Sequence, residues 1–250
     1  MSNREVFSRI YRLREWNGDG ERSSFSGPGS TPTASKFYVD QVSRFIVDKS
    51  ISSVTDVGHG DWFMWPKSFF KGISYTGFDV AEGVSDVCNV RFGDENTKFV
   101  SEDFAKANAP VSELLLIKDV LGHLTISDIE AILYKASQYK YVIICEGFKK
   151  VSFWDIGIIL RRIIQLRRRA RYAMRLKNPF IALPLFDLHL LMNNKEIETG
   201  AHRALNFSKS PFRLDAYGLE LLEHANYQGD DFRVFCTEKR VWFLKGKNCD

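Results

Sequence analysis

Two glycines follow a β-branched run at Val54–Asp61, which reads Val-Thr-Asp-Val-Gly-His-Gly-Asp. Such a run predicts a strand that ends in a tight turn and opens a helix. Gly58 and Gly60 would let backbone N–H groups approach a ligand, because no Cβ stands in the way. Asp79 follows Gly58 by 21 positions, at the end of the next strand-like run, where a carboxylate can bind the two hydroxyls of a ribose. The spacing therefore predicts a site for a nucleoside-containing cofactor.

Further polar residues follow the other strand-like runs. Ligands of open α/β sheets bind beyond the carboxyl ends of the strands, so residues at these ends are candidates for the same site. The candidates are Asp56, Gly58, His59, Gly60, Asp61, Asp79, Glu102, Asp103, Phe104, Lys118, Asp119, His123 and Glu146.

Strands alternate with helices, which predicts right-handed crossovers and a parallel sheet. The predicted strands are Ser53–Val57, Tyr75–Asp79, Lys98–Ser101, Glu113–Ile117, Tyr141–Glu146, Phe232–Cys236 and Arg240–Leu244, and the predicted helices are Arg4–Glu15, Thr33–Asp48 and Ser127–Tyr139. Ser127 is the predicted N-cap of the last helix, with Glu130 at its capping-box position. The short link between the last two strands requires an antiparallel hairpin. We therefore predict an α/β fold with a seven-stranded sheet, parallel except for its last strand.

Composition fits a single domain of 250 residues, with 44% hydrophobic and 14% aromatic residues for a packed core. The four cysteines form no C-x-x-C pair, and we interpret them as reduced, structural residues. Met1–Leu13 lacks the apolar segment of a signal peptide, and no apolar run reaches the roughly 18 residues of a membrane span. These features predict a cytoplasmic protein.

Positive charge is concentrated in one segment. Lys149–Lys177 contains ten Lys or Arg and one acid, a charge of +9 against +4 for the whole chain. Ile156–Lys177 predicts a basic helix with one apolar face, and the apolar segment Phe180–Met192 follows it. Packing on the domain, peripheral membrane contact through 156–192 and contact with a phosphate-bearing acceptor are the alternatives. The pattern argues against nucleic acid, because the positive charge is confined to one helix.

Four motifs resemble the successive motifs of class I S-adenosylmethionine-dependent methyltransferases. They are Asp-Val-Gly-His-Gly-Asp-Trp at 56–62, Gly-Phe-Asp-Val at 77–80, Ser-Glu-Asp-Phe at 101–104 and Leu-Ile-Lys-Asp-Val-Leu-Gly-His-Leu at 116–124. The segments 16–30 and 194–212 resemble a subgroup found with polysaccharide and glycan biosynthesis genes. The resemblance covers about residues 10–148 and 193–245. It implies one Rossmann-like domain, in which 1–50 covers the cofactor, 51–148 binds it, 149–192 is a basic insert, and 193–250 forms an acceptor loop and hairpin.

The resemblance also implies the cofactor, S-adenosylmethionine, and the product S-adenosylhomocysteine. Gly58 and Gly60 would pass under the methionine part, Asp79 would bind the ribose, and the loop 26–30 would fold over the cofactor. The implied cofactor-binding residues are Ser26, Gly27, Gly29, Ser30, Asp56, Gly58, His59, Gly60, Asp61, Asp79, Val80, Asp103, Phe104 and Lys118. Asp61 departs from the usual third glycine of the first motif. His202-Arg203-Ala204 stands where the late motif usually has Tyr-Arg-Pro.

The implied reaction is methyl transfer to a hydroxyl of a sugar or glycan, such as a deoxysugar, carried on a lipid or a nucleotide. A hydroxyl is a poor nucleophile unless a base takes its proton, and it must lie in line with the methyl group at about 3 Å. His123, just past the fourth strand, is the candidate base, and His202 is the alternative. Asp119 would orient the base or bind the acceptor. No H-x-x-x-H spacing indicates a metal site, so we predict none.

Two other functions fit the same residues. The chain could methylate RNA or protein through its arginine-rich helix, or it could be a non-catalytic module that only binds the cofactor. A nicotinamide-dependent dehydrogenase is disfavoured, because no hydride-transfer constellation is visible.

Overall fold

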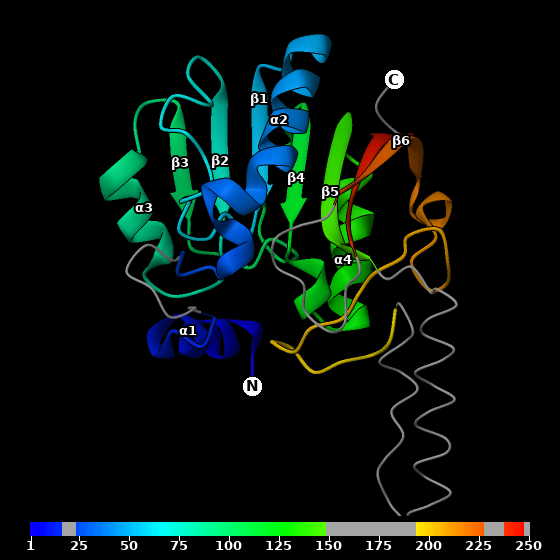
Figure 1. Cartoon of the computed structure of the whole chain (residues 1–250), viewed down its shortest axis with the longest axis horizontal. Coiled ribbons are helices and arrows are strands. Elements are labelled where there is room, and N and C mark those ends of the chain that lie inside the picture. Colours follow the sequence, from blue (N-terminus) through cyan, green and yellow to red (C-terminus); the bar gives the residue numbers. More distant parts are fainter. Residues whose placement is uncertain (17–23, 149–193, 228–237, 248–250) are drawn as a thin grey trace, which may run out of the picture.

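The structure is a computed structural model that describes residues 1–16, 24–148, 194–227 and 238–247 of the chain. Within these ranges the chain folds around a seven-stranded sheet with the order β3-β2-β1-β4-β5-β7-β6 (Figure 1). The strands are β1 (Ser53–Val57), β2 (Ser74–Phe78), β3 (Thr97–Val100), β4 (Leu114–Lys118), β5 (Tyr141–Phe148), β6 (Leu219–Tyr227) and β7 (Glu238–Gly246). The helices are α1 (Asn3–Leu13), α2 (Pro32–Lys49), α3 (Val84–Phe92) and α4 (Ile126–Ala136), with shorter turns at η1 (Pro28–Ser30), η2 (Leu121–His123) and η5 (Leu214–Tyr217).

The sheet confirms the predicted architecture. Strands β1 to β5 are parallel, whereas β7 is antiparallel to both of its neighbours, β5 and β6. The five parallel strands lie within two residues of their predicted bounds. The prediction missed β6, which is the antiparallel partner of β7, and the strand predicted at Phe232–Cys236 lies outside the described residues. Most β6 side chains are exposed, so this edge strand lacks the buried apolar run that marks β1, β4 and β5.

Side chains of β4 divide the core into two layers. Leu114 and Leu116 belong to the apolar cluster that contains the buried residues of α2, and Leu115 and Ile117 belong to the cluster that contains those of α4. All four side chains are fully buried. Successive side chains of a strand point to opposite faces, so α2 and α4 cover opposite faces of the sheet.

Helix ends follow from short polar side chains. The hydroxyl of Ser2 accepts from the backbone N–H of Glu5, whose carboxylate accepts from the Ser2 N–H, which completes a capping box for α1. The predicted cap of α4 was wrong. Thr125, not Ser127, accepts from the N–H of Asp128, because the helix begins at Ile126 and the residue before it is the N-cap. The predicted capping-box residue, Glu130, instead accepts a hydrogen bond from the Tyr217 hydroxyl at 3.2 Å.

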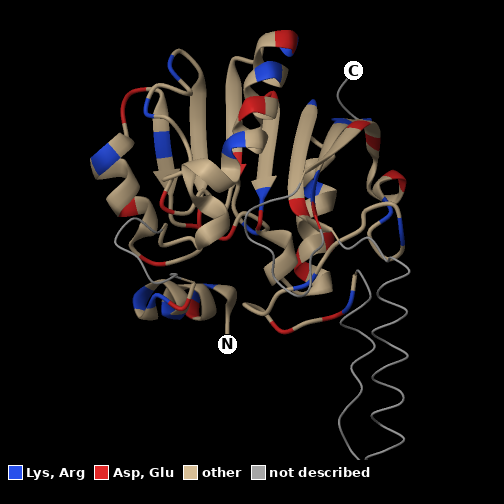
Figure 2. Cartoon of the chain, in the orientation of Figure 1, with Lys and Arg blue, Asp and Glu red and all other residues tan. Residues whose placement is uncertain are grey.

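Helix α1 crosses beneath the carboxyl ends of the strands, as Figure 1 shows. Its Arg4 guanidinium donates to the backbone oxygen of Ser101 at 2.8 Å, and its Ser8 hydroxyl accepts from the backbone N–H of Glu82 at 2.9 Å. Both partners follow strand ends, so α1 is fastened to the edge of the sheet where Brändén's rule places ligands. Figure 2 shows that acidic residues gather between this edge and α1.

Several predictions fall outside the described residues, namely the basic helix Ile156–Lys177, the segment Phe180–Met192 and two of the four cysteines. Cys88 and Cys145 are free, buried thiols. None of the helices in the described ranges combines the length and apolar character that a bilayer span requires.

Asp56 is a carboxyl in the core of the sheet. It is 2% exposed and accepts a hydrogen bond from the Tyr75 hydroxyl at 2.7 Å. Burial raises the pKa of Asp56 to about 7, although the hydrogen bond from Tyr75 opposes this shift. The folded state therefore binds this proton more tightly than the unfolded state, so stability falls as the pH rises from about 4 to about 7.

We predict that the stability of Asp56→Asn relative to wild type rises by about 2–3 kcal/mol when the pH increases from 5 to 8. The reason is that the amide does not ionise and still accepts from Tyr75. Urea unfolding at both pH values measures this gain. Asp48→Asn, at an exposed position of α2, is the control and should change stability by about 0.5 kcal/mol or less at either pH. The same effect of Asp56→Asn at both pH values would contradict the prediction.

Candidate active site

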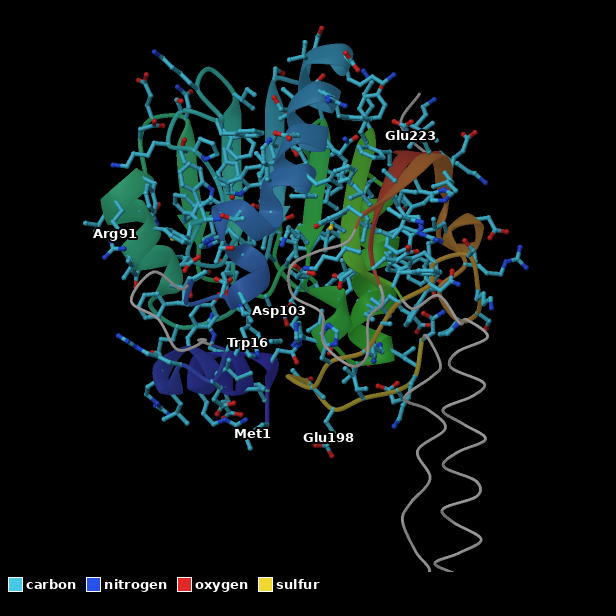
Figure 3. All side chains as sticks on the ribbon, in the orientation of Figure 1. Met1, Trp16, Arg91, Asp103, Glu198 and Glu223 are labelled. Atoms are coloured by element: carbon cyan, nitrogen blue, oxygen red, sulfur yellow. The ribbon has the colours of Figure 1, made fainter. Side chains whose placement is uncertain are left out.

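A pocket opens at the carboxyl ends of the parallel strands, between the sheet and α1. Figure 3 shows Trp16 and Asp103, two of its lining residues, in this space. The empty space between the pocket walls, counted out into the solvent at its open mouth, is about 1420 Å³. Residues of α1, η2 and several strand ends line this pocket, which is the usual place for a small-molecule ligand in an open α/β sheet.

Glycine shapes the first wall of the pocket at the end of β1. Gly58 has φ +71°, and a Cβ there would lie 2.3 Å from the Val120 side chain, so only glycine fits this turn. Its N–H donates to the backbone oxygen of Phe78 at 2.7 Å, which ties the turn to the end of β2. Asp79 follows directly and accepts from the N–H of Gly60 at 3.1 Å and of Ala81 at 2.8 Å. The turn thereby fixes a buried carboxylate at the pocket wall.

The loop that contains Ser26, Gly27, Gly29 and Ser30 lines the pocket on another side. Asp61 anchors this loop through hydrogen bonds. Its carboxylate accepts from the Ser24 hydroxyl at 2.9 Å and from the backbone N–H of Phe25 at 2.6 Å. The Ser26 hydroxyl accepts from the N–H of Asp61 at 2.9 Å and lies 2.8 Å from the Tyr11 hydroxyl of α1. The departure from the usual third glycine is thus an anchor for the covering loop.

A second group of lining residues follows β2 and β3. Val80, Asp103 and Phe104, three of the residues that the resemblance implied for cofactor binding, all line the pocket. Phe104 is 3% exposed and packs on Phe78, with ring centroids 5.7 Å apart. Lys135 of α4 donates to the backbone oxygen of Phe104 at 2.7 Å, and its ammonium lies 4.6 Å from the Phe104 ring centroid.

Two lysines, one from β4 and one from β7 on the other side of β5, share one carboxylate. The Lys118 ammonium lies 2.6 Å from an Asp119 oxygen and also donates to the backbone oxygen of Gly29 at 2.9 Å, and Lys239 pairs with the same oxygen of Asp119. Burial alone would raise the pKa of Asp119, but the two ammonium groups outweigh it and hold the pKa well below its usual value. Asp119 is therefore ionised, and the pairs join β4, β7 and the covering loop.

His123 lies past β4, at the end of η2. Its Nδ1 lies 2.8 Å from the backbone oxygen of Ala201, which can only accept, so in the neutral ring Nδ1 carries the hydrogen and Nε2 carries the lone pair. Glu146 fixes the start of η2, because its carboxylate accepts from the backbone N–H groups of Val120, Leu121 and Gly122. Burial, with the charge of Asp119, raises the pKa of Glu146 to about 7.

His202 approaches His123 from a distant part of the sequence. Their ring centroids are 5.0 Å apart, and both rings line the pocket. Arg203 is buried next to them. The backbone N–H of Arg203 donates to the backbone oxygen of Gly122 at 3.0 Å, and its guanidinium lies 5.8 Å from the Phe212 ring centroid. The segment 201–203 is therefore fixed against η2.

Four predicted cofactor residues do not line the pocket. Asp56 is buried against Tyr75, and Asp61 faces the covering loop. His59 is 3% exposed, and its Nε2 lies 3.0 Å from the Ser85 hydroxyl; burial lowers its pKa. Gly60 packs against Ser26, since a Cβ there would lie 2.2 Å from the Ser26 hydroxyl. These residues shape the turn and support the loop, and their predicted contact with the cofactor stays a prediction.

The remaining predicted residues come together in one pocket. They are Ser26, Gly27, Gly29, Ser30, Gly58, Asp79, Val80, Asp103, Phe104, Lys118, Asp119, His123 and His202. Sequence reasoning missed Tyr11, Trp16, Asp128 and Lys239, which also line it. Asp128, the acid in the first turn of α4, could have been found from its place after the fourth strand, because ligands bind beyond strand ends. Among the described residues, no group of three or more His, Cys, Asp and Glu side chains is arranged to hold a metal.

Solved structures share this architecture. The chain is similar to magnesium protoporphyrin IX methyltransferase from Synechocystis PCC 6803 with bound S-adenosylhomocysteine, at 14% identity and a TM-score of 0.56, covering 98% of this chain and 99% of that one. It is similar to the N-methyltransferase NodS from Bradyrhizobium japonicum WM9, at 11% identity and a TM-score of 0.55, covering 96% and 97%. Human N-acetylserotonin methyltransferase matches at 15% identity and a TM-score of 0.55, covering 98% and 60%.

No family model matches the sequence, and a search of curated proteins returns no match. At these low identities the structural likeness shows the fold, which is the Rossmann-like fold of class I methyltransferases.

We predict that Asp61→Ala loosens the covering loop, because it removes the acceptor of the Ser24 and Phe25 hydrogen bonds. Hydrogen bonds to a charged group contribute about 1.5–3 kcal/mol, so amide exchange in 24–30 should accelerate by about 10–100-fold. Hydrogen exchange followed by mass spectrometry measures it. Asp61→Asn keeps one acceptor oxygen and should give a smaller change, with peptides of β4 as the internal reference. Unchanged exchange in Asp61→Ala would refute the anchor.

Proposed function

We propose that this protein is a methyltransferase that uses S-adenosylmethionine and releases S-adenosylhomocysteine. The observation that carries the proposal is the Asp79 carboxylate in the pocket at the end of β2. Each of its oxygens accepts one backbone N–H, and a carboxylate has about four acceptor positions, so both oxygens can also accept from ribose hydroxyls. Proteins of the same fold, including the Synechocystis enzyme and NodS, were crystallised with S-adenosylhomocysteine, which supports this choice.

The chemistry of the lining residues fits this cofactor. Asp79, Glu102, Asp103 and Asp128 line the pocket and favour positively charged ligand groups, such as a sulfonium and an ammonium. Phe104 offers an apolar ring for adenine, and Lys118 offers an ammonium for the methionine carboxylate. Ser26, Gly27, Gly29 and Ser30 would cover the ligand from the opposite wall.

The bound cofactor supplies an electrophilic methyl group, because its sulfonium leaves as a neutral thioether. The protein must then hold a nucleophile in line and keep water out. We propose His123 as the general base: its Nε2 takes the proton of the acceptor hydroxyl, while the Nδ1 hydrogen stays bonded to Ala201. His202, 5.0 Å away between ring centroids, and Asp119 contribute to the same end of the pocket.

We propose a sugar or glycan as the acceptor, carried on a lipid or a nucleotide. The resemblance of segments 16–30 and 194–212 to a glycan-associated subgroup supports it, and both segments reach the pocket, through Trp16 and His202. An aromatic wall with a few polar groups suits a ring that has apolar faces and hydroxyl edges. The alternative acceptors, RNA and protein, rest on Ile156–Lys177, which lies outside the described residues.

We predict that wild-type protein binds S-adenosylhomocysteine, and that Asp79→Ala binds it at least about tenfold more weakly, because charge-assisted hydrogen bonds contribute about 1.5–3 kcal/mol. Titration calorimetry measures both affinities, and thermal melting checks that the variant is folded. Asp86→Ala, at an exposed position of α3, is the matched control and should bind like wild type. Absence of binding by wild type, or equal binding by Asp79→Ala, would sink the proposed cofactor site.

We predict transfer of label from methyl-labelled cofactor to a hydroxyl-bearing saccharide in a panel of glycans and nucleotide sugars. His123→Asn should slow the transfer by about 10²–10⁴-fold, because it removes the base, and leave S-adenosylhomocysteine affinity unchanged. Mass spectrometry of the products identifies the acceptor. Labelling of RNA or protein, with none on saccharides, would replace the glycan proposal by its rival, and binding without any transfer would favour a non-catalytic module.

A further inference from the structure

Three aromatic rings from distant parts of the sequence meet at the acceptor end of the pocket. The indole of Trp16 and the imidazole of His123 have ring centroids 4.9 Å apart and planes inclined by 38°. The imidazole of His202 also contacts His123, with ring centroids 5.0 Å apart and planes inclined by 62°. All three rings line the pocket, so an acceptor that reaches His123 also meets Trp16.

Trp16 is held in this position by α1. The centroid of its ring lies 5.9 Å from that of Phe7 and 6.1 Å from that of Tyr11. Figure 3 shows Trp16 between α1 and the sheet, on the side of the pocket. Contacts with α1 therefore place the Trp16 indole beside the His123 imidazole.

The backbone fixes His123 against this indole. Its N–H donates to the Val120 oxygen at 3.0 Å, and its oxygen accepts from the Gly200 N–H at 2.9 Å. The Nδ1 contact with Ala201, at 2.8 Å, sets the direction of the ring. Since both the main chain and one ring nitrogen are held, the Trp16 contact is a fixed feature of the imidazole's environment.

We propose that Trp16 is a positioning residue that stabilises the protonated form of His123 and thereby strengthens it as the general base. This proposal rests on the proposed function. The π-face of tryptophan attracts a cation within about 6 Å of the ring centroid, and the centroid distance here is 4.9 Å. When Nε2 takes the acceptor proton, the new positive charge forms beside this ring and beside the Ala201 oxygen. The indole therefore stabilises the charge that arises during the reaction, and not the neutral base.

Other charged and titratable groups share the pocket and act on the same imidazole. His202 faces it directly, and Tyr11 stands behind Trp16 on α1. Asp119, paired with Lys118 and Lys239, precedes η2. Asp128 and Glu238 line the pocket from α4 and β7. Substitution of Trp16 leaves all of these groups in place, so the contribution of the indole can be measured separately.

The test is the titration of the histidine ring signals by NMR on the whole protein without cofactor. The chain has five histidines, and the spectrum of His123→Asn assigns the signal of His123. In Trp16→Leu, which keeps an apolar wall but no ring, the midpoint for His123 should fall by about 0.4–1.5 pH units. Trp16→Phe keeps a weaker π-face and should give a smaller fall. The exposed His224 is the internal reference. An unchanged or raised midpoint in Trp16→Leu would overturn the proposal.

Two further measurements distinguish this inference from an effect of His202 and from a failure of the proposed function. In a His202→Asn background, Trp16→Leu should still lower the midpoint, whereas loss of the effect would assign it to His202 and overturn the proposal. In the transfer assay, the acid limb of the kcat profile should move to lower pH in Trp16→Leu by the same amount. A shifted His123 midpoint with no methyl transfer would leave the ring contact standing and refute the proposed function. Transfer with an unshifted midpoint would refute the role of Trp16 alone.

Discussion

The pocket depends on one constraint, which is that β1, β2 and β4 run parallel in register and end at the same edge. Val57 pairs with Phe78 on one side and Ile117 on the other, so Gly58, Asp79 and Lys118 follow at the same level. Backbone hydrogen bonds set this alignment, and the apolar layers on both faces hold it. Side chains that are up to about sixty positions apart in the sequence therefore need no direct contact with one another to share a site.

Three polar junctions then close the pocket over that edge. Asp61 and Tyr11 meet at the Ser26 hydroxyl, which joins the β1 turn, the covering loop and α1. Asp119 joins Lys118 to Lys239, and Lys118 also reaches the Gly29 oxygen. Glu146 holds η2 through three backbone donors. Because each junction is at least partly buried, its hydrogen bonds are stronger than they would be in water.

The sequence predicted the parallel strands closely because each is a short apolar run followed by glycine or an acid, and these patterns are local. It missed β6, whose side chains are mostly exposed, and it placed the α4 cap at Ser127 because two hydroxyl residues two positions apart offer the same signal. His59 and Asp61, which it assigned to the cofactor, do not line the pocket, because the tight turn directs His59 into the core and Asp61 toward the loop. Trp16 and Lys239 reach the pocket only through tertiary packing, which local patterns do not encode.

The place of Trp16 has a practical consequence for solution work. The chain contains five tryptophans, of which Trp62, Trp65 and Trp242 are buried in the core and Trp154 lies outside the described residues. Trp16 is the described indole that lines the pocket, and a ligand that enters must alter its surroundings. The intrinsic fluorescence of the protein therefore carries a built-in optical reporter of occupancy, available without any label.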